Sequence, residues 1–160
     1  MDDCITGWSA LLKQFGCMLQ NRRVLVVDDH EDSRSLFEHV LRCEQADVML
    51  ASSVSQALQI VGCYKPHLIL TDIALPGEDG FSLLRQIRQM SLGQIKRVPV
   101  VAVTGFVSCD LLSEVQQAGF QECLLKPVDL DRLLQTVKTL TSPKLVEFDW
   151  DTRLNQSIFF

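Results

Sequence analysis

The regular alternation of short apolar runs with segments of helical apolar spacing is the feature that most constrains the fold. The runs are Val24–Val27, Val48–Ala51, Leu68–Thr71, Val98–Thr104 and Cys123–Leu125. Continuous apolar runs of this length are typical of strands buried on both faces, as in a parallel sheet covered by helices. The alternation therefore predicts an α/β fold of (βα)5 type, a doubly wound parallel five-stranded sheet over residues 22–141.

The segments between the runs support the helix assignments. In the first of them Leu36, Val40 and Leu41, with Phe37 beside them, form an apolar stripe that we expect to face the sheet. Suitable cap residues flank three of the expected helices: Ser53, Asp79 and Gly119.

Composition excludes several functions. The 160 residues carry 15 basic and 20 acidic groups, a net charge of −5, with no basic stripe to neutralise nucleic-acid phosphates. No apolar run approaches the roughly 20 residues of a membrane span, and the N-terminus lacks a charged region followed by an apolar stretch. We therefore expect one sizeable domain, in the cytoplasm, that does not bind nucleic acid and has no membrane span.

The cysteines and histidines make no zinc pattern. Six cysteines lie at wide spacings without a CxxC pair, and there are only three histidines. We expect the cysteines to be reduced and to act as small buried residues. His30, which follows two aspartates, is interpreted as an exposed residue that opens a helix rather than as a ligand.

Two terminal extensions flank the predicted domain, at residues 1–21 and 142–160. The first is expected to form an amphipathic helix with five apolar residues on one face: Trp8, Leu11, Leu12, Phe15 and Leu19. The second follows Pro143 and is rich in aromatic residues: Phe148, Trp150, Phe159 and Phe160. Either the extensions pack against the domain or lie disordered, or they bind a partner or a second copy of the chain.

The residues that carry chemistry follow the ends of the predicted strands. Asp28 and Asp29 follow the first strand, Asp72 ends the third, Thr104 ends the fourth and Lys126 ends the fifth. Open parallel sheets bind ligands at their carboxyl edge, where the strand order reverses. We expect these side chains to converge on one pocket.

Three carboxylates in one pocket repel one another unless a cation lies between them. A site with few protein oxygens and room for water and phosphate suits Mg²⁺. Lysine adds a positive charge for a phosphoryl oxygen, and threonine adds a hydroxyl donor. The combination predicts metal-assisted phosphoryl transfer in which a carboxylate can be the nucleophile.

Four motifs resemble the receiver domain of two-component response regulators, over about residues 22–141. They are VLVVDDHEDSR (24–34), LILTDIALPGEDG (68–80), VVAVTG (100–105) and LLKP (124–127). The resemblance implies the flavodoxin-like strand order 2-1-3-4-5 and a cis peptide bond between Lys126 and Pro127, which proline permits at low cost.

The resemblance also implies roles for the pocket residues. Asp72 would accept a phosphoryl group from a phosphohistidine of a sensor histidine kinase or phosphotransfer protein. Mg²⁺ would be held by Asp28, Asp29, Asp72 and the backbone carbonyl of Ala74. Thr104 and Lys126 would bind the phosphoryl oxygens, and the phosphorylated state would shift a two-state equilibrium that changes protein contacts.

Two positions depart from the family pattern. Cys123 stands where the family usually has Tyr or Phe, so the usual aromatic switch is absent, and neither Phe106 nor Phe120 occupies the matching position. Ala74 offers the metal only its backbone carbonyl and has no side chain to screen the phosphoryl group. These departures leave open how phosphorylation is transmitted and how fast it is lost.

Two other functions compete with that of a phosphoacceptor, which is a signalling domain and not an enzyme with turnover. Cys123 and the aromatic extensions would also suit a receiver-like module that binds partners independently of phosphorylation. Phosphohydrolases of the haloacid-dehalogenase type also use a strand-end Asp, a Thr, a Lys and Mg²⁺. They usually place a second Asp two residues after the nucleophile, where this chain has Ala74.

Overall fold

A computed structural model describes residues 19–106 and 108–142. The strands are β1 (Arg23–Val27), β2 (Asp47–Ala51), β3 (Leu68–Asp72), β4 (Val100–Thr104) and β5 (Glu122–Leu125). The helices are α2 (Glu31–Cys43), α3 (Val54–Tyr64), α4 (Gly80–Gln89), α5 (Cys109–Ala118) and α6 (Leu130–Thr141), with a short 3₁₀ helix η1 (Ile95–Arg97) before β4.

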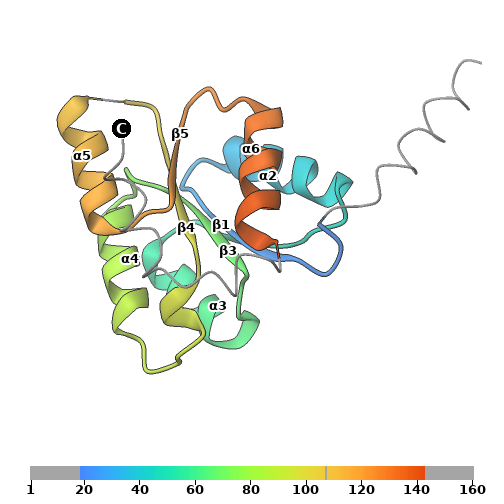
Figure 1. The fold of residues 1–160 in the computed structure, drawn as a ribbon, viewed down its shortest axis with the longest axis horizontal. Coiled ribbons are helices and arrows are strands. Elements are labelled where there is room, and N and C mark those ends of the chain that lie inside the picture. Colours follow the sequence, from blue (N-terminus) through green and yellow to red (C-terminus); the bar gives the residue numbers. More distant parts are fainter. Residues whose placement is uncertain (1–18, 107, 143–160) are drawn as a thin grey trace, which may run out of the picture.

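The five strands form one parallel sheet in the order β2-β1-β3-β4-β5 (Figure 1). Each neighbouring pair is parallel, with Val27 opposite Thr71, Asp72 opposite Val103, and Thr104 opposite Leu125 near the carboxyl ends. The predicted (βα)5 fold and the strand order 2-1-3-4-5 are confirmed. The order reverses at β1 and β3, which brings the ends of these two strands together.

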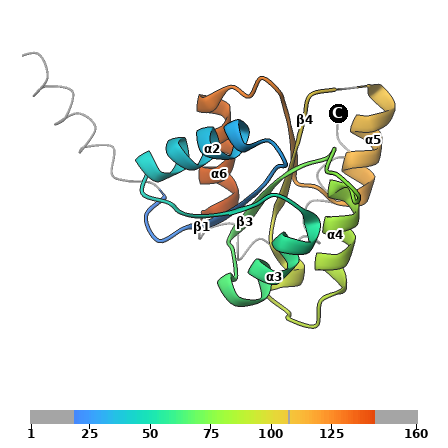
Figure 2. The same ribbon diagram turned by 180° about the vertical axis from the view of Figure 1, so that it is seen from behind.

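Alternate residues of each strand enter two separate cores. Leu25 of β1 belongs to a cluster of buried side chains between the sheet and α3, α4 and α5. Val24 and Val26 belong to a second cluster, between the sheet and α2 and α6. Figures 1 and 2 show these two helical layers on opposite faces of the sheet. Burial on both faces explains why the strands are continuously apolar in sequence.

The predicted caps form at three helix ends. The Ser53 side chain accepts a hydrogen bond from the backbone N–H of Gln56 at the start of α3, and Asp79 accepts one from Ser82 at the start of α4. Gly119 follows α5 with a φ of 98°, which glycine adopts without strain. The Ser53 and Asp79 caps lie where α3 and α4 begin, at the carboxyl edge of the sheet, whereas Gly119 lies where the chain turns from α5 into β5, at the opposite edge.

Three expectations about packing are wrong. Leu36 is 47% exposed, whereas Phe37 and Leu41 of the same expected stripe are buried, so the buried face of α2 is centred on Phe37 and Leu41. Val98 and Pro99 precede β4 rather than form part of it, since Val98 caps η1. Among the described cysteines, three lie on outward faces of helices and are exposed, and only the fourth is half-buried: Cys43, Cys63, Cys109 and Cys123.

The predicted terminal extensions fall largely outside the described residues, so the helix at 1–21 and the aromatic segment at 142–160 stay predictions. Within the described part of the first, Leu19 is fully buried in the cluster shared with α2. No helix in the part of the chain that the structure describes combines the length and apolar character needed to cross a bilayer.

Candidate functional site

Five of the seven predicted site residues lie at the carboxyl edge of the sheet. Asp28 and Asp29 follow β1, Asp72 ends β3, Thr104 ends β4 and Lys126 follows β5. Asp28, Asp72 and Thr104 are buried, with exposures of 1%, 6% and 6%, whereas Asp29 is exposed. The parallel register places all of these strand ends along one edge.

Lys126 joins the carboxylates of β1 and β3. Its Nζ donates hydrogen bonds to Oδ2 of Asp28 at 2.7 Å and to Oδ2 of Asp72 at 2.6 Å. Burial acts to lower the pKa of Lys126, but the hydrogen bonds and charges of the two aspartates outweigh it, so the pKa lies above its usual range. The lysine is therefore a charged group that neutralises part of the acidic pocket.

The backbone around Lys126 is held by its neighbours. Its N–H donates to the carbonyl of Thr104 at 2.8 Å, which extends the β4–β5 pairing by one residue. The Lys126–Pro127 peptide bond is cis, as the resemblance implied. The lysine therefore leaves β5 directly over the ends of β3 and β4.

Asp28 is fixed by groups on α2. Its Oδ1 accepts a hydrogen bond from the backbone N–H of His30 at 2.9 Å, and its carbonyl accepts one from a guanidinium N–H of Arg34 at 2.7 Å. Arg34 was not among the residues predicted for the site. Its position six residues after Asp28, where the first turn of α2 closes, could have identified it as a cation near the acidic pair.

Asp72 is held by the loop that follows it. Its Oδ1 accepts a hydrogen bond from the backbone N–H of Ala74 at 2.9 Å, and its carbonyl accepts one from the hydroxyl of Thr71 at 2.9 Å. Gly80, the first residue of α4, lies against the same carbonyl and donates its N–H to the carbonyl of Ile73. The glycine thus allows α4 to approach the end of β3 closely.

Thr104 uses its hydroxyl within its own loop. Oγ1 donates to the carbonyl of Phe106 at 3.0 Å and accepts from the backbone N–H of the same residue at 3.3 Å. The side chain of Phe106 is largely in solvent, with an exposure of 71%. A ligand that recruited the Thr104 hydroxyl would therefore have to compete with this loop.

Cys123 lies on β5, where it packs against the core that also contains Phe120. Burial and the charge of Glu122 raise the pKa of its thiol, although Arg132 opposes them. The thiol thus takes part in the packing of the sheet against this core.

The donor set fits a hard divalent cation. Asp28, Asp29, His30 and Asp72 each offer one ligand atom, and these atoms all lie within 4.8 Å of one another. Carboxylate oxygens are the ligands that Mg²⁺ prefers, together with water and phosphate oxygens. Lys126 pairs with Asp28 and Asp72 but not with Asp29, so a further positive charge is favourable near Asp29.

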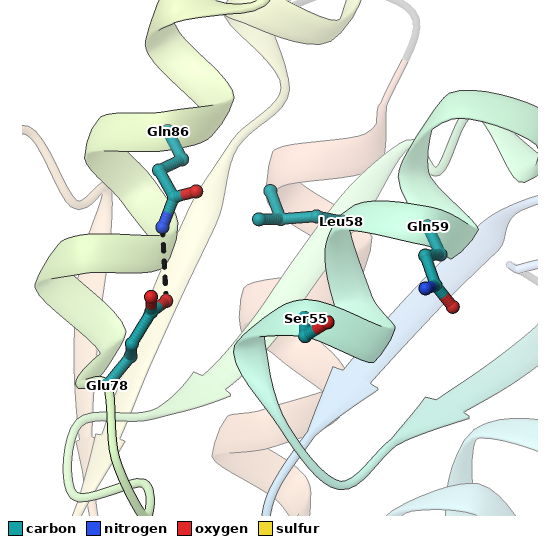
Figure 3. A pocket seen from close by; sticks show the side chains of 5 residues that line it. All are labelled: Ser55, Leu58, Gln59, Glu78 and Gln86. Atoms are coloured by element: carbon teal, nitrogen blue, oxygen red, sulfur yellow. Dashed lines mark hydrogen bonds between the residues drawn. The ribbon is translucent and has the colours of Figure 1, made fainter.

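A groove lies between α3 and α4 (Figure 3). It has a volume of about 420 Å³ and is lined by Ser55, Leu58, Gln59, Glu78 and Gln86. Glu78 already accepts a hydrogen bond from Gln86 at 3.1 Å. Glu78 is the one ionisable residue among these five, so the groove offers less charged chemistry than the cluster of Asp28, Asp72 and Lys126.

The fold and the acidic pocket together define a doubly wound α/β domain with its polar site at the switch in strand order. Residues 24–138 match the sequence profile of the response regulator receiver domain family. The chain belongs to this family of signalling domains, which pair with histidine kinases or phosphotransfer proteins. This membership decides against the phosphohydrolase alternative.

Several curated proteins are similar to this chain in sequence. The chain is 33% identical over 115 residues to an uncharacterized 14.6 kDa protein of Leptolyngbya boryana, covering 72% of this chain and 86% of that protein. It is 29% identical over 120 residues to sporulation initiation phosphotransferase F of Bacillus subtilis, covering 75% and 94%. It also matches response regulator protein PilR of Pseudomonas aeruginosa at 33% over 139 residues, but spans only 30% of that protein.

Solved structures agree with the fold. A putative response regulator from Chloroflexus aurantiacus is 30% identical with a TM-score of 0.70, and the match covers 75% of this chain and 97% of that one. Chemotaxis response regulator CheY4 of Vibrio cholerae is 26% identical with a TM-score of 0.68, and the match covers 74% and 98%. The shared part is the receiver fold.

Proposed function

We propose that the protein is a phosphoacceptor receiver of a two-component phosphorelay, and that Asp72 takes the phosphoryl group from a sensor histidine kinase or phosphotransfer protein. The observation that carries this proposal is the contact of Lys126 with both Asp28 and Asp72 in a largely buried pocket. Family membership and the name of the Bacillus subtilis relative, sporulation initiation phosphotransferase F, support the same chemistry.

The proposed transfer needs little covalent chemistry from the protein. A carboxylate oxygen of Asp72 forms a bond to phosphorus while the P–N bond of the donor's phosphohistidine breaks, and the electron pair of that bond returns to the imidazole. The main contributions are positioning and neutralisation of charge. The Ala74 N–H holds the nucleophile in place through Oδ1, on the opposite oxygen from Lys126.

Asp28, Asp29, Asp72 and the backbone carbonyl of Ala74 are the proposed ligands of Mg²⁺. When bound, Mg²⁺ would offset the repulsion between the carboxylates and the incoming phosphoryl oxygens. Lys126 is proposed to move its hydrogen bond from Asp72 to a phosphoryl oxygen. The Thr104 hydroxyl is proposed to exchange its bonds with Phe106 for another phosphoryl oxygen, which would release the loop after β4.

Incubation with acetyl phosphate and Mg²⁺, followed by intact-mass spectrometry, tests the proposal. We expect one phosphoryl group on the wild-type protein, none after Mg²⁺ is chelated and none on Asp72→Asn. Asp110→Asn, which changes an exposed aspartate on α5, is the matched control and should be labelled like the wild type. Labelling of Asp72→Asn at the wild-type level would contradict the assignment of Asp72.

One observation favours a second function, that of a binding module independent of phosphorylation. Cys123 is half-buried against the core and has no ring that could move between buried and exposed positions. Sedimentation with and without beryllofluoride and Mg²⁺ distinguishes the phosphoacceptor from the phosphorylation-independent binding module. A change in assembly or shape that Asp72→Asn abolishes supports the phosphoacceptor, whereas identical sedimentation alongside normal phosphorylation supports the module.

The domain boundaries are part of the proposal. We propose residues 22–141 as the receiver and residues 1–21 and 142–160 as extensions that contact a downstream protein or a second copy of the chain. Their apolar residues, which include both tryptophans, support this assignment.

A further inference from the structure

His30 adds a ring nitrogen to the acidic pocket. The residue occupies the N-cap position of α2, and its side chain is 71% exposed, as expected of a residue that opens a helix. Its ring is nevertheless turned towards the carboxylates. Nδ1 lies 3.1 Å from Oδ1 of Asp29 and 3.4 Å from Oδ1 of Asp28.

These distances suit ligands of one metal ion. Adjacent ligands with bond lengths of ~2.1–2.3 Å lie about 3.0–3.3 Å apart, and opposite ligands lie about 4.2–4.6 Å apart. The distance from His30 to Asp29 matches that of adjacent ligands. The limit of 4.8 Å for the whole set, which includes Asp72, is close to that of opposite ligands. Small side-chain adjustments would bring all four groups to a common ion.

His30 and Lys126 approach Asp28 from different sides. Lys126 contacts Oδ2 of Asp28, whereas the His30 ring faces Oδ1. Asp29 has no lysine or arginine within ion-pair distance among the described residues, and its contact is the His30 ring. The oxygens that Lys126 leaves free for a cation are therefore the ones beside this ring.

We propose that His30 is a nitrogen ligand of the divalent cation in this pocket, so that the site favours imidazole-preferring metals over Mg²⁺ more strongly than an all-oxygen site would. The inference rests on the proposed function, because it assumes the same cation site. The neutral ring with its proton on Nε2 presents the Nδ1 lone pair to the ion. Imidazole suits Ni²⁺ and other first-row transition metals, whereas Mg²⁺ prefers oxygen ligands.

Calorimetric titration of the full chain with NiCl₂ and with MgCl₂ tests the proposal. We expect His30→Asn to lower the ratio of Ni²⁺ to Mg²⁺ affinity by about tenfold, while its Mg²⁺ affinity changes by less than roughly threefold, since an amide oxygen replaces the nitrogen. His39→Asn is the matched control on the same helix. Its ring lies 3.9 Å from Sγ of Cys43, so this variant also measures Ni²⁺ bound outside the pocket.

Pulsed electron paramagnetic resonance of bound Mn²⁺ gives a second measurement that does not depend on affinity. We expect a coupling to a ring nitrogen in the wild type and in His39→Asn, and none in His30→Asn. An unchanged Ni²⁺ to Mg²⁺ ratio in His30→Asn, or a nitrogen coupling that persists there, overturns the inference.

Asp29→Asn and Asp72→Asn separate this inference from the proposed function. If both aspartate variants lose Mg²⁺ binding while His30→Asn changes neither the Ni²⁺ to Mg²⁺ affinity ratio nor the nitrogen coupling, the inference fails and the phosphoacceptor proposal stands. If neither aspartate variant affects Mg²⁺ binding, the proposed cation site and the inference both fail.

Discussion

Gly80 lies so close to Asp72 that a β-carbon at residue 80 would be 2.6 Å from the carbonyl oxygen of Asp72. The nearest obstacle is backbone, which cannot move aside as a flexible side chain can. The start of α4 can therefore lie this close to the end of β3, which carries the proposed phosphoacceptor, only because residue 80 has no side chain.

Substitution of this glycine should destabilise the protein. Gly80→Ala is expected to lower the free energy of unfolding by ~1–3 kcal/mol, as overpacking does, and to slow the phosphorylation of Asp72. Gly62→Ala in α3 is the matched control, because its β-carbon would have no neighbour within 4 Å; it should be stabilising by ~0.4–1 kcal/mol. Urea unfolding measures both, and equal stabilities of the two variants would contradict the argument.

Loss of Lys126 should cost stability because it leaves two buried carboxylates without their cation. In a buffer with a chelator, Lys126→Met is expected to lower the free energy of unfolding by ~2–3 kcal/mol, somewhat less than for a fully buried pair. Lys138→Met removes a more exposed ion pair with Glu44 and should cost at most about 1 kcal/mol. Addition of Asp28→Asn to Lys126→Met should restore part of the loss.

His67 should make stability depend on pH. Burial, and then the charges of Arg23 and Arg22, lower its pKa below 6.5, and Nδ1 accepts a hydrogen bond from the backbone N–H of Arg23. Below pH 6.5 the unfolded chain therefore binds more protons at this residue than the folded one, so the stability that the neutral ring contributes is lost as the pH falls.

The measurement compares the wild type with His67→Asn, whose Oδ1 can accept the same hydrogen bond without titrating. The free energy of unfolding of the wild type should fall relative to that of the variant as the pH drops from 7.5 to 5. Parallel curves over this range would show that His67 does not contribute.

Cys123 should be the slowest to react of the described cysteines. Burial and the charge of Glu122 raise the pKa of its thiol, whereas Cys43, Cys63 and Cys109 are exposed. In a short pulse of iodoacetamide at pH 8, followed by peptide mass spectrometry, we expect Cys123 to be labelled at least about tenfold more slowly than those three. The difference should vanish in urea, and similar rates in the native protein would contradict its placement.

Much of the fold and the convergence of the pocket could be predicted from the sequence. Continuous apolar runs report burial on both faces, and parallel strands end at one edge, so Asp28, Asp72 and Lys126 were expected to meet there. The structure brings them within hydrogen-bond distance.

Other features depend on tertiary packing and could not be predicted. Apolar spacing on α2 allowed either Leu36 or Phe37 to face the sheet, and only the position of the helix decides that Phe37 is buried. The ring of His30 turns towards the carboxylates through a side-chain rotation that no sequence pattern specifies. The close approach of Gly80 to Asp72 likewise depends on where α4 begins.

The position of Lys126 after the last strand has a consequence for biosynthesis. The ribosome releases β1 and β3, with Asp28 and Asp72, well before the lysine that is to join them. A nascent chain that ends before β5 contains Asp28 and Asp72 but not yet Lys126, the lysine that pairs with both of them. Electrostatic completion of the site therefore coincides with the addition of the edge strand, and a chain truncated before residue 126 cannot reach the same charge balance.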